Sequence, residues 1–123
     1  IEAVQHCIRA HRFRSTEQPE TIEAKVVFDA DKLDAIGAIG VARAIGYATL
    51  ADTPYYDEPS EQFRENGELE EGEQHSAYHE HIFKLSKIVD KLYTQAAIEI
   101  GRKRQALMET FFEGLAAEYQ GKQ

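Results

Sequence analysis

The feature that most constrains this fold is a group of three carboxylates inside an otherwise apolar helical segment. Asp29, Asp31 and Asp34 stand in the run 29–40, whose other side chains are mainly Ala, Ile and Gly. Asp31 and Asp34 are three residues apart and share a helical face, whereas Asp29 points about 160° away from Asp31 on ideal helical geometry. Because an isolated buried charge is costly, Asp31 must be neutralised by a cation, a partner or a metal if flanking helices cover its face.

The spacing of apolar residues predicts that the first half of the chain is helical. We expect a helix over residues 2–11, a central helix over 21–36 and another through residue 51. Gly37 and Gly40 begin a line of small residues, where another helix can approach closely. A stripe with steps of three and four residues is expected to be the buried face of the central helix, and it comprises Ile22, Val26, Ala30, Leu33 and Gly37.

The second half predicts two further helices, over residues 75–92 and 94–119, with Thr94 as the N-cap of the second. Their apolar faces are expected to pack as an antiparallel pair, through Ile82, Leu85, Ile88, Val89 and Leu92 of one and Ala97, Ile100, Leu107, Phe111, Leu115 and Ala116 of the other. The stretch 52–74 has no helical period and reads as a partly mobile acidic loop. Tyr55 and Tyr56 are its best candidates to fold back on the body or to stack on a base.

The charge of the chain excludes some functions. Residues 57–73 contain eight acids and one base, Arg64, so this stretch carries -7 of the net charge of -8. Such a balance argues against binding of duplex nucleic acid, where phosphates require a basic face, but it is compatible with a small phosphorylated substrate. No run approaches the ~18 apolar residues of a membrane-spanning helix. The single Cys7 fits a reducing cytosol, so we predict a cytoplasmic protein without membrane partners and leave homo-oligomerisation open.

The carboxylate segment also carries a family resemblance. The run 29–43, Asp-Ala-Asp-Lys-Leu-Asp-Ala-Ile-Gly-Ala-Ile-Gly-Val-Ala-Arg, resembles a signature of the HD-domain phosphohydrolases. Upstream, Ile8-x-x-His11 and Pro19-x-Thr21 resemble segments of the same family. Downstream, the residues that resemble its closing pair of helices are Lys84, Leu85, Thr94, Arg104, Met108 and Glu118. The resemblance therefore covers nearly the whole chain.

The resemblance implies an all-α, HD-domain-like helical bundle with a divalent metal. Members of the family bind this metal through a first-helix His, a His-Asp dipeptide and a later Asp inside an Ala-Asp-[Arg/Lys]-Leu segment. Only the last of these occurs here, as Asp31, and the sequence contains no His-Asp dipeptide. We therefore expect residues 1–123 to be the C-terminal portion of a single longer HD-like domain, and we assign no catalytic residue.

The resemblance further implies that the intact parent is a divalent-metal-dependent phosphohydrolase acting on a phosphate ester or a nucleotide, and that this segment alone is inactive. Asp31 would be one ligand of the metal, for which Mg, Mn, Fe, Ni and Zn are all candidates. Asp34 would orient the neighbours of Asp31 or a bound water. His11, Arg43 and Lys84 would neutralise the charge of the substrate phosphate. An Asp31 side chain that points into solvent would argue against this hypothesis.

Two alternatives stay open. The chain could be a non-catalytic helical interaction or regulatory module whose acidic loop binds a basic partner. The three aspartates would then be surface charges or would pair with Arg9, Arg12 and Arg43. It could also be a nucleotide-sensing domain that binds without turnover. His75 and His79 have the spacing of zinc ligands on a helix, but the Glu of His-Glu-x-x-His is absent in that register, so we expect His75, His79 and His81 to lie at the surface or behind other ligands.

Overall fold

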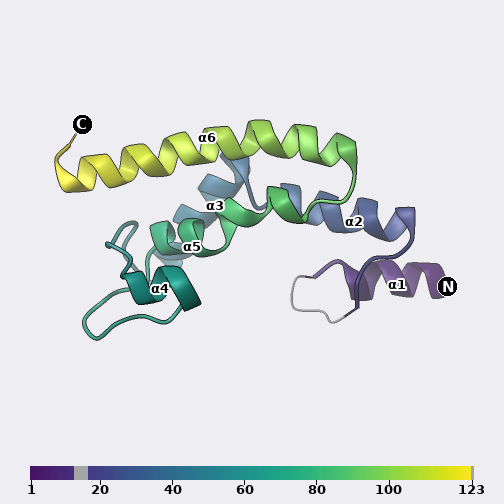
Figure 1. Ribbon diagram of the computed structural model, residues 1–123, viewed down its shortest axis with the longest axis horizontal. Coiled ribbons are helices and arrows are strands. Elements are labelled where there is room, and N and C mark those ends of the chain that lie inside the picture. Colours follow the sequence, from purple (N-terminus) through teal and green to yellow (C-terminus); the bar gives the residue numbers. More distant parts are fainter. Residues whose placement is uncertain (13–16, 123) are drawn as a thin grey trace.

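The computed structural model describes residues 1–12 and 17–122, and every regular element in these two ranges is a helix. In Figure 1, α6 runs along one side of the molecule, α2, α3 and α5 lie beneath it, and α1 lies against α2 at the N-terminal end. The predicted all-α helical fold is therefore confirmed. In chain order the elements are α1 (Glu2–Ala10), α2 (Ile22–Leu33), α3 (Gly37–Leu50), α4 (Glu61–Asn66), α5 (Ala77–Phe83), the 3₁₀ turns η1 (Leu85–Lys87) and η2 (Val89–Lys91), and α6 (Gln95–Gln120).

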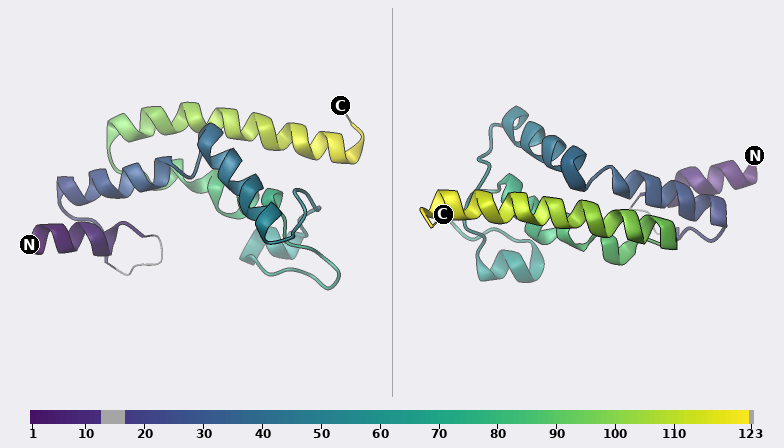
Figure 2. Two further views of the ribbon diagram at one scale, coloured as in Figure 1. Left: turned by 180° about the vertical axis from the view of Figure 1, so that it is seen from behind. Right: turned by 90° about the horizontal axis from the view of Figure 1, so that it is seen from above.

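The corner between α2 and α3 depends on a glycine. Figure 2 shows α3 turning away from α2, and the two axes differ by 60°. Gly37 begins α3 with φ +73°, and a Cβ atom at this position would lie 2.8 Å from Cβ of Arg104 on α6. A side chain at Gly40 would likewise meet the backbone of Ala35 and the end of Met108. The expected close approach of another helix at these small residues is therefore confirmed, and the partner is α6.

The single helices and one bent pair of helices differ in whether they could cross a membrane. In residues 1–12 and 17–122, no single helix is long and apolar enough to cross a bilayer. Helices α2 and α3 together, as a pair bent by 60°, might be long and apolar enough, by length and composition only.

The predicted buried stripe of α2 is wrong at three of its five residues, whereas Leu33 packs against the core and Gly37 is buried. The side chains of Ile22, Val26 and Ala30 are exposed, with Ile22 at 62%. The helix turns a different face to α1 and α6, so that its buried residues are Ala24, Phe28, Asp29 and Lys32. Apolar residues occur on both faces of α2, and spacing alone cannot tell which of them the neighbouring helices cover.

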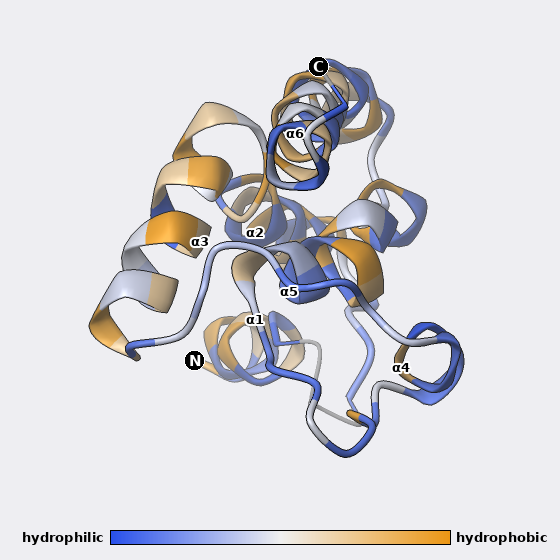
Figure 3. Ribbon diagram, turned by 90° about the vertical axis from the view of Figure 1, so that its left-hand side faces the viewer, coloured by the Kyte–Doolittle hydropathy of each residue, from blue (hydrophilic) through white to orange (hydrophobic). Residues whose placement is uncertain are grey.

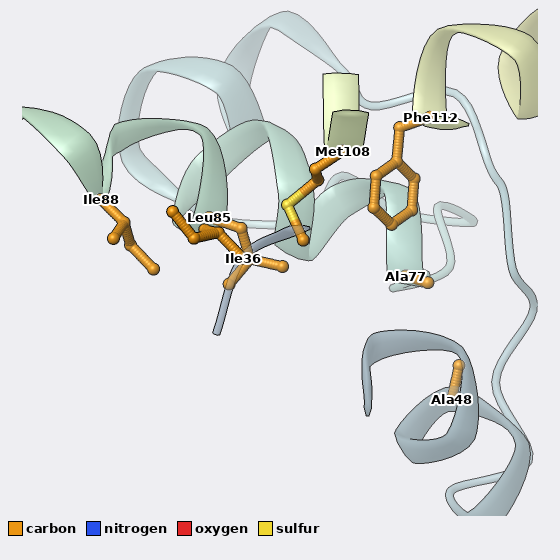
Figure 4. Close-up of a cluster of buried hydrophobic side chains, with 7 residues drawn as sticks. All are labelled: Ile36, Ala48, Ala77, Leu85, Ile88, Met108 and Phe112. Atoms are coloured by element: carbon orange, nitrogen blue, oxygen red, sulfur yellow. The ribbon is translucent and has the colours of Figure 1, made fainter. Parts of the chain in front are cut away.

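The core lies between α6 and the layer formed by α3, α5 and η1. Figure 4 shows Met108 and Phe112 of α6 among the other buried side chains of this cluster, which are Ile36, Ala48, Ala77, Leu85 and Ile88. Ile100, Leu107 and Phe111, which the sequence placed on the buried face of α6, are exposed instead. The buried residues of α6 are Ala97, Gly101, Met108, Phe112 and Ala116.

The helix predicted over residues 75–92 is interrupted. Helix α5 ends at Phe83, the backbone of Lys84 leaves the helical region with φ -123° and ψ -57°, and two 3₁₀ turns follow. Leu85, Ile88 and Leu92 are buried as expected. A 3₁₀ turn and an α-helix place apolar residues at nearly the same spacing, so the pattern could not reveal the interruption.

The start of α6 is as predicted. Thr94 Oγ1 accepts a hydrogen bond from the backbone N–H of Ala97 at 3.3 Å. An N-cap of this kind satisfies one of the N–H groups that lack a partner in the first turn of a helix.

The acidic stretch has a defined conformation and contains α4, which the sequence did not predict. Ser60 caps α4 by accepting a hydrogen bond from the N–H of Phe63. Tyr56 folds back on the body, as expected, and its ring contacts those of Tyr78 and Tyr119 at centroid distances of 4.9 and 5.4 Å. Figure 3 shows this part of the chain, around α4, as mostly hydrophilic. The stretch is therefore a hydrophilic excursion that aromatic contacts hold against the helices.

Candidate functional site

A pocket of about 410 Å³ lies between α3 and α5, and we call it the α3–α5 pocket. Arg43 and Tyr47 line it from α3. His75, Glu80 and Lys84 line it from the other side, in and around α5. Arg43 and Lys84 were both expected to bind the phosphate of a substrate. They line the same pocket, although they are far apart in the chain.

The charged side chains of the α3–α5 pocket are exposed or half-exposed. Glu80 lies between two basic groups: Oε2 is 3.4 Å from His75 Nε2, and Oε1 is 3.8 Å from Lys84 Nζ. Arg43 Nη1 donates to the backbone carbonyl of Asp34 at 3.0 Å. The pocket thus combines two permanent cations, one histidine and one carboxylate. Such a set can bind a small anion, because guanidinium and ammonium groups make strong charge-assisted hydrogen bonds to phosphate oxygens.

His75 and Tyr47 were not among the predicted substrate-binding residues. His75 precedes Ser76, the N-cap of α5, and Tyr47 follows Arg43 by one helical turn. The turn relation to Arg43 was visible in the sequence and is the one signal that points to Tyr47. No sequence signal brings His75 to the pocket, because its place depends on how the acidic stretch returns to α5.

Asp31 is not the buried acid that the sequence indicated. Its side chain is 51% exposed, and Oδ2 accepts a hydrogen bond from Lys32 Nζ at 2.9 Å. The amino group of Lys32 is buried and also donates to the carbonyl oxygen of His11 at 2.6 Å. The covered face of α2 is the one that carries Lys32, so Asp31 points outward. The hypothesis of a metal ligand can therefore no longer rest on burial.

The buried acid is Asp29, which is 2% exposed. Its carboxylate accepts hydrogen bonds from the backbone N–H groups of Tyr93 and Thr94 at 2.9 and 2.8 Å, and from Thr94 Oγ1 at 2.8 Å. A negative charge beside the first N–H groups of a helix is favourable. Asp29 therefore joins α2 to the start of α6 and serves the fold.

Asp34 and His11 lie outside the α3–α5 pocket. Asp34 is the C-cap of α2, and the group that Arg43 contacts is its carbonyl rather than its carboxylate. His11 is the C-cap of α1, where Nδ1 donates to the carbonyl of Ile8 at 2.5 Å. Through Lys32, His11 is connected to Asp31 and not to Arg43 and Lys84. The structure thus divides the predicted residues into two groups.

The described residues do not by themselves fit a divalent metal. Among residues 1–12 and 17–122, no group of three or more His, Cys, Asp or Glu side chains is placed to hold one. Asp31 offers one carboxylate, and the partner of this carboxylate is an ammonium group.

Two of the three histidines that were expected at the surface or behind other ligands are buried. His79 is completely buried, and His81 stacks on Phe112 with ring centroids 4.5 Å apart. Burial lowers the pKa of His81, because the interior disfavours the charged imidazolium. His75 is the one of the three that remains accessible to a ligand.

The chain resembles several bacterial proteins, whereas no family model matches it. It is 32% identical over 124 residues to the uncharacterized protein YpgQ of Bacillus subtilis, a match that covers 98% of this chain and 53% of YpgQ. The crystal structure of YpgQ has a TM-score of 0.74 at 32% identity and covers 99% of this chain and 56% of that one. YpgQ has also been solved in complex with ADP, with a TM-score of 0.70.

Two further solved structures are similar. A protein from Lactobacillus plantarum has a TM-score of 0.76 at 29% identity and covers 98% of this chain and 62% of that one. An HD-superfamily hydrolase from Bacillus thuringiensis has a TM-score of 0.64 at 32% identity and covers 81% and 47%. The chain spans about half the length of the curated relative that it matches. The chain therefore has an HD-domain-like helical fold, and its resemblance to the HD-domain superfamily is confirmed.

Proposed function

We propose that the parent of this chain is a divalent-metal-dependent phosphohydrolase that acts on a nucleotide or another phosphate ester. The observation that carries the proposal is the α3–α5 pocket, in which Arg43, Lys84 and His75 converge on one space. Its size is in the range of small-molecule sites. The comparisons support the same chemistry, since one similar structure is that of an HD-superfamily hydrolase and another holds ADP.

In this proposal the basic side chains of the pocket bind the phosphate. Arg43 can offer two parallel N–H groups to phosphate oxygens, and Lys84 acts as a mobile point charge. His75 adds a hydrogen bond from the α5 side. Tyr47 is 79% exposed at the rim, so its ring offers a face on which a nucleobase can stack.

The metal requires groups from outside the described residues. Asp31 would be one ligand. Its half-exposed carboxylate becomes accessible to a metal once Lys32 Nζ releases Oδ2 of Asp31. A divalent metal would supply Lewis-acid chemistry at the phosphate. Because this chain provides one of the family's ligands, we expect the 123-residue chain alone to bind metal poorly and to be inactive.

The test is an assay of the intact parent on a panel of nucleotides and phosphate esters, with the products identified. We expect Asp31→Ala to abolish turnover while the far-UV circular dichroism is retained. Arg43→Ala should raise KM about tenfold, the equivalent of one lost charge-assisted hydrogen bond. Arg102→Ala is the matched control, because Arg102 is exposed on α6 and does not line the pocket. Undiminished turnover by Asp31→Ala would refute the proposal.

A nucleotide-sensing domain is the second candidate. It is favoured by the lack of a group of metal ligands among residues 1–12 and 17–122. The same panel separates the two functions, since a sensor binds a nucleotide in the α3–α5 pocket and releases no product. A protein that binds neither nucleotide nor metal would instead fit the non-catalytic interaction module.

A further inference from the structure

One carboxylate of the acidic stretch differs from the others because it is buried. The side chain of Glu73 is 6% exposed, and its Oε2 lies 2.7 Å from Nε2 of the fully buried His79. The other nitrogen of this ring, Nδ1, lies 2.7 Å from Ser76 Oγ. We call Glu73, Ser76 and His79 the Glu73 network. It joins the end of the acidic stretch to the first turn of α5.

The Glu73 network satisfies its own polar groups. The carboxylate of Glu73 also accepts the backbone N–H groups of Ser60 at 2.9 Å and Glu70 at 2.8 Å. An ionised carboxylate can only accept, so His79 Nε2 must donate to it. The hydroxyl of Ser76 can then donate to Nδ1 while it accepts the backbone N–H of His79 at 3.1 Å. A buried network in which every member has a partner is rigid and holds one geometry.

Hydrogen bonds keep Glu73 ionised in this position. Burial alone would raise the pKa of its carboxyl group. Hydrogen bonds from Ser60, from the backbone of Glu70 and from His79 outweigh that effect and lower the pKa from 4.5 to about 2. At neutral pH the buried group is therefore a carboxylate that orients His79.

The Glu73 network is continuous with one wall of the α3–α5 pocket. Ser76 caps α5 and lines the pocket, and the adjacent His75 also lines the pocket. Glu80 and Lys84, one and two helical turns further on, complete the same wall. The direction in which α5 leaves Ser76 thus sets where these side chains lie opposite Arg43.

We infer that Glu73 and His79 are positioning residues for the α3–α5 pocket, holding the start of α5 so that His75 and Lys84 face Arg43. This inference rests on the proposed function for the nature of the ligand. Neither side chain lines the pocket, so neither is expected to touch the substrate. Both act by fixing the wall of the pocket. Replacing either one is expected to weaken phosphate binding although every phosphate-binding side chain is still present.

The test measures pyrophosphate and ADP binding by the 123-residue chain and by the intact parent. Glu73→Gln keeps the size of the side chain and removes its charge. We expect it to weaken pyrophosphate binding about tenfold, as for a small displacement of binding groups. Glu71→Gln is the matched control, because Glu71 carries the same charge in the same stretch and is exposed. Circular dichroism confirms that both variants fold at the temperature of the measurement.

A double-mutant cycle separates positioning from a general loss of stability. If the network acts through His75, then Glu73→Gln and His75→Ala have non-additive effects on pyrophosphate binding. A role in stability alone would lower the midpoint of thermal unfolding and leave the binding constant of the folded protein unchanged. Additive effects on binding, or an unchanged binding constant in Glu73→Gln, would overturn the inference.

A ligand-free measurement distinguishes failure of this inference from failure of the proposed function. In Glu73→Gln, the NMR signals of His75, Glu80 and Lys84 should shift relative to the unaltered protein, and in Glu71→Gln they should not. If the unaltered parent binds neither pyrophosphate nor ADP, the proposed function fails, and the NMR comparison still decides the positioning role. Unshifted signals in Glu73→Gln would contradict that role whatever the ligand.

Discussion

The junction between α2 and α6 and the α3–α5 pocket use charged side chains in opposite ways. At the junction, Asp29 is buried and accepts three hydrogen bonds from Tyr93 and Thr94. In the pocket, Arg43 and Lys84 are exposed and arranged around open space. A buried charge whose hydrogen bonds are all made within the chain holds helices together. Exposed charges that converge on a pocket can still bind a ligand.

This difference changes the meaning of the three aspartates. Their position in an apolar segment suggested one costly carboxylate, and the resemblance suggested that it was Asp31. The carboxylate that is costly to bury is that of Asp29, and hydrogen bonds within the fold compensate this cost. Asp31 stays half-exposed beside Lys32. Burial is therefore evidence for a structural role of Asp29. The exposure of Asp31 is the observation that was expected to argue against a metal ligand, so that role now rests on the family resemblance alone.

The strongest test of the comparison is Asp29→Asn. The amide keeps one accepting oxygen but presents an NH2 group in place of the other, so that at least one buried backbone N–H of Tyr93 or Thr94 loses its acceptor. We expect the free energy of unfolding to fall by about 3 kcal/mol. Urea denaturation of the purified chain measures this change. Asp34→Asn is the control, since Asp34 is exposed, and it should change stability by less than about 0.5 kcal/mol. Equal effects of the two substitutions would remove the distinction between the junction and the surface carboxylates.

Glycines of α3 offer a second and smaller contrast. Gly37 has positive φ and lies against Arg104 at the corner that α6 crosses, whereas a side chain at Gly46 would meet nothing within 4 Å. Gly37→Ala is expected to destabilise the chain by about 2 kcal/mol, through backbone strain and crowding. Gly46→Ala should stabilise it by up to about 1 kcal/mol, because alanine favours the helix. Thermal unfolding measures both. A tolerated Gly37→Ala would mean that the corner is less constrained than its geometry indicates.

The helix boundaries that the sequence predicted well are those with a local chemical cause. Thr21 and Thr94 each cap the helix that follows, and Gly37 permits the turn into α3. These effects act over a few residues, so a single sequence contains them. The end of α5 at Phe83 was missed because the apolar spacing continues through the 3₁₀ turns with little change.

The buried faces were predicted less well, because burial depends on residues far away in the chain. The exposed Ile22 and Val26 of α2 are as apolar as the buried Phe28, and only the positions of α1 and α6 decide between them. The same reason explains why Asp31 was expected to be buried in place of Asp29.

The candidate site was predicted in part. The resemblance identified Arg43 and Lys84, and both line the α3–α5 pocket. It also identified His11, which lies at the end of α1 instead. His75 could not have been found, since it reaches the pocket only through the fold of the acidic stretch and the buried contact of Glu73 with His79.

The smallest expected effect concerns the dependence of stability on acid, at a site that lies between the two kinds of region. Glu73 is buried like Asp29, yet it belongs to the wall of the pocket. Its pKa in the folded chain, about 2, lies below the usual 4.5, so its ionised form stabilises the fold above pH 4.5. This contribution should be lost as the pH falls from about 4.5 toward 2. Urea midpoints measured across that range should therefore fall less steeply in Glu73→Gln than in the unaltered chain.

Glu73→Gln should keep part of the dependence of the urea midpoint on pH. Hydrogen bonds from Arg9 and His6 also lower the pKa of Glu17, and that group titrates in both proteins. Glu71→Gln should follow the unaltered chain, because Glu71 is exposed. If Glu73→Gln has the same acid dependence as Glu71→Gln, then Glu73 behaves as a surface carboxylate. The Glu73 network would then resemble the rest of the acidic stretch more closely than it resembles the junction at Asp29, and the role of Glu73 in holding the wall of the pocket would lose its physical basis.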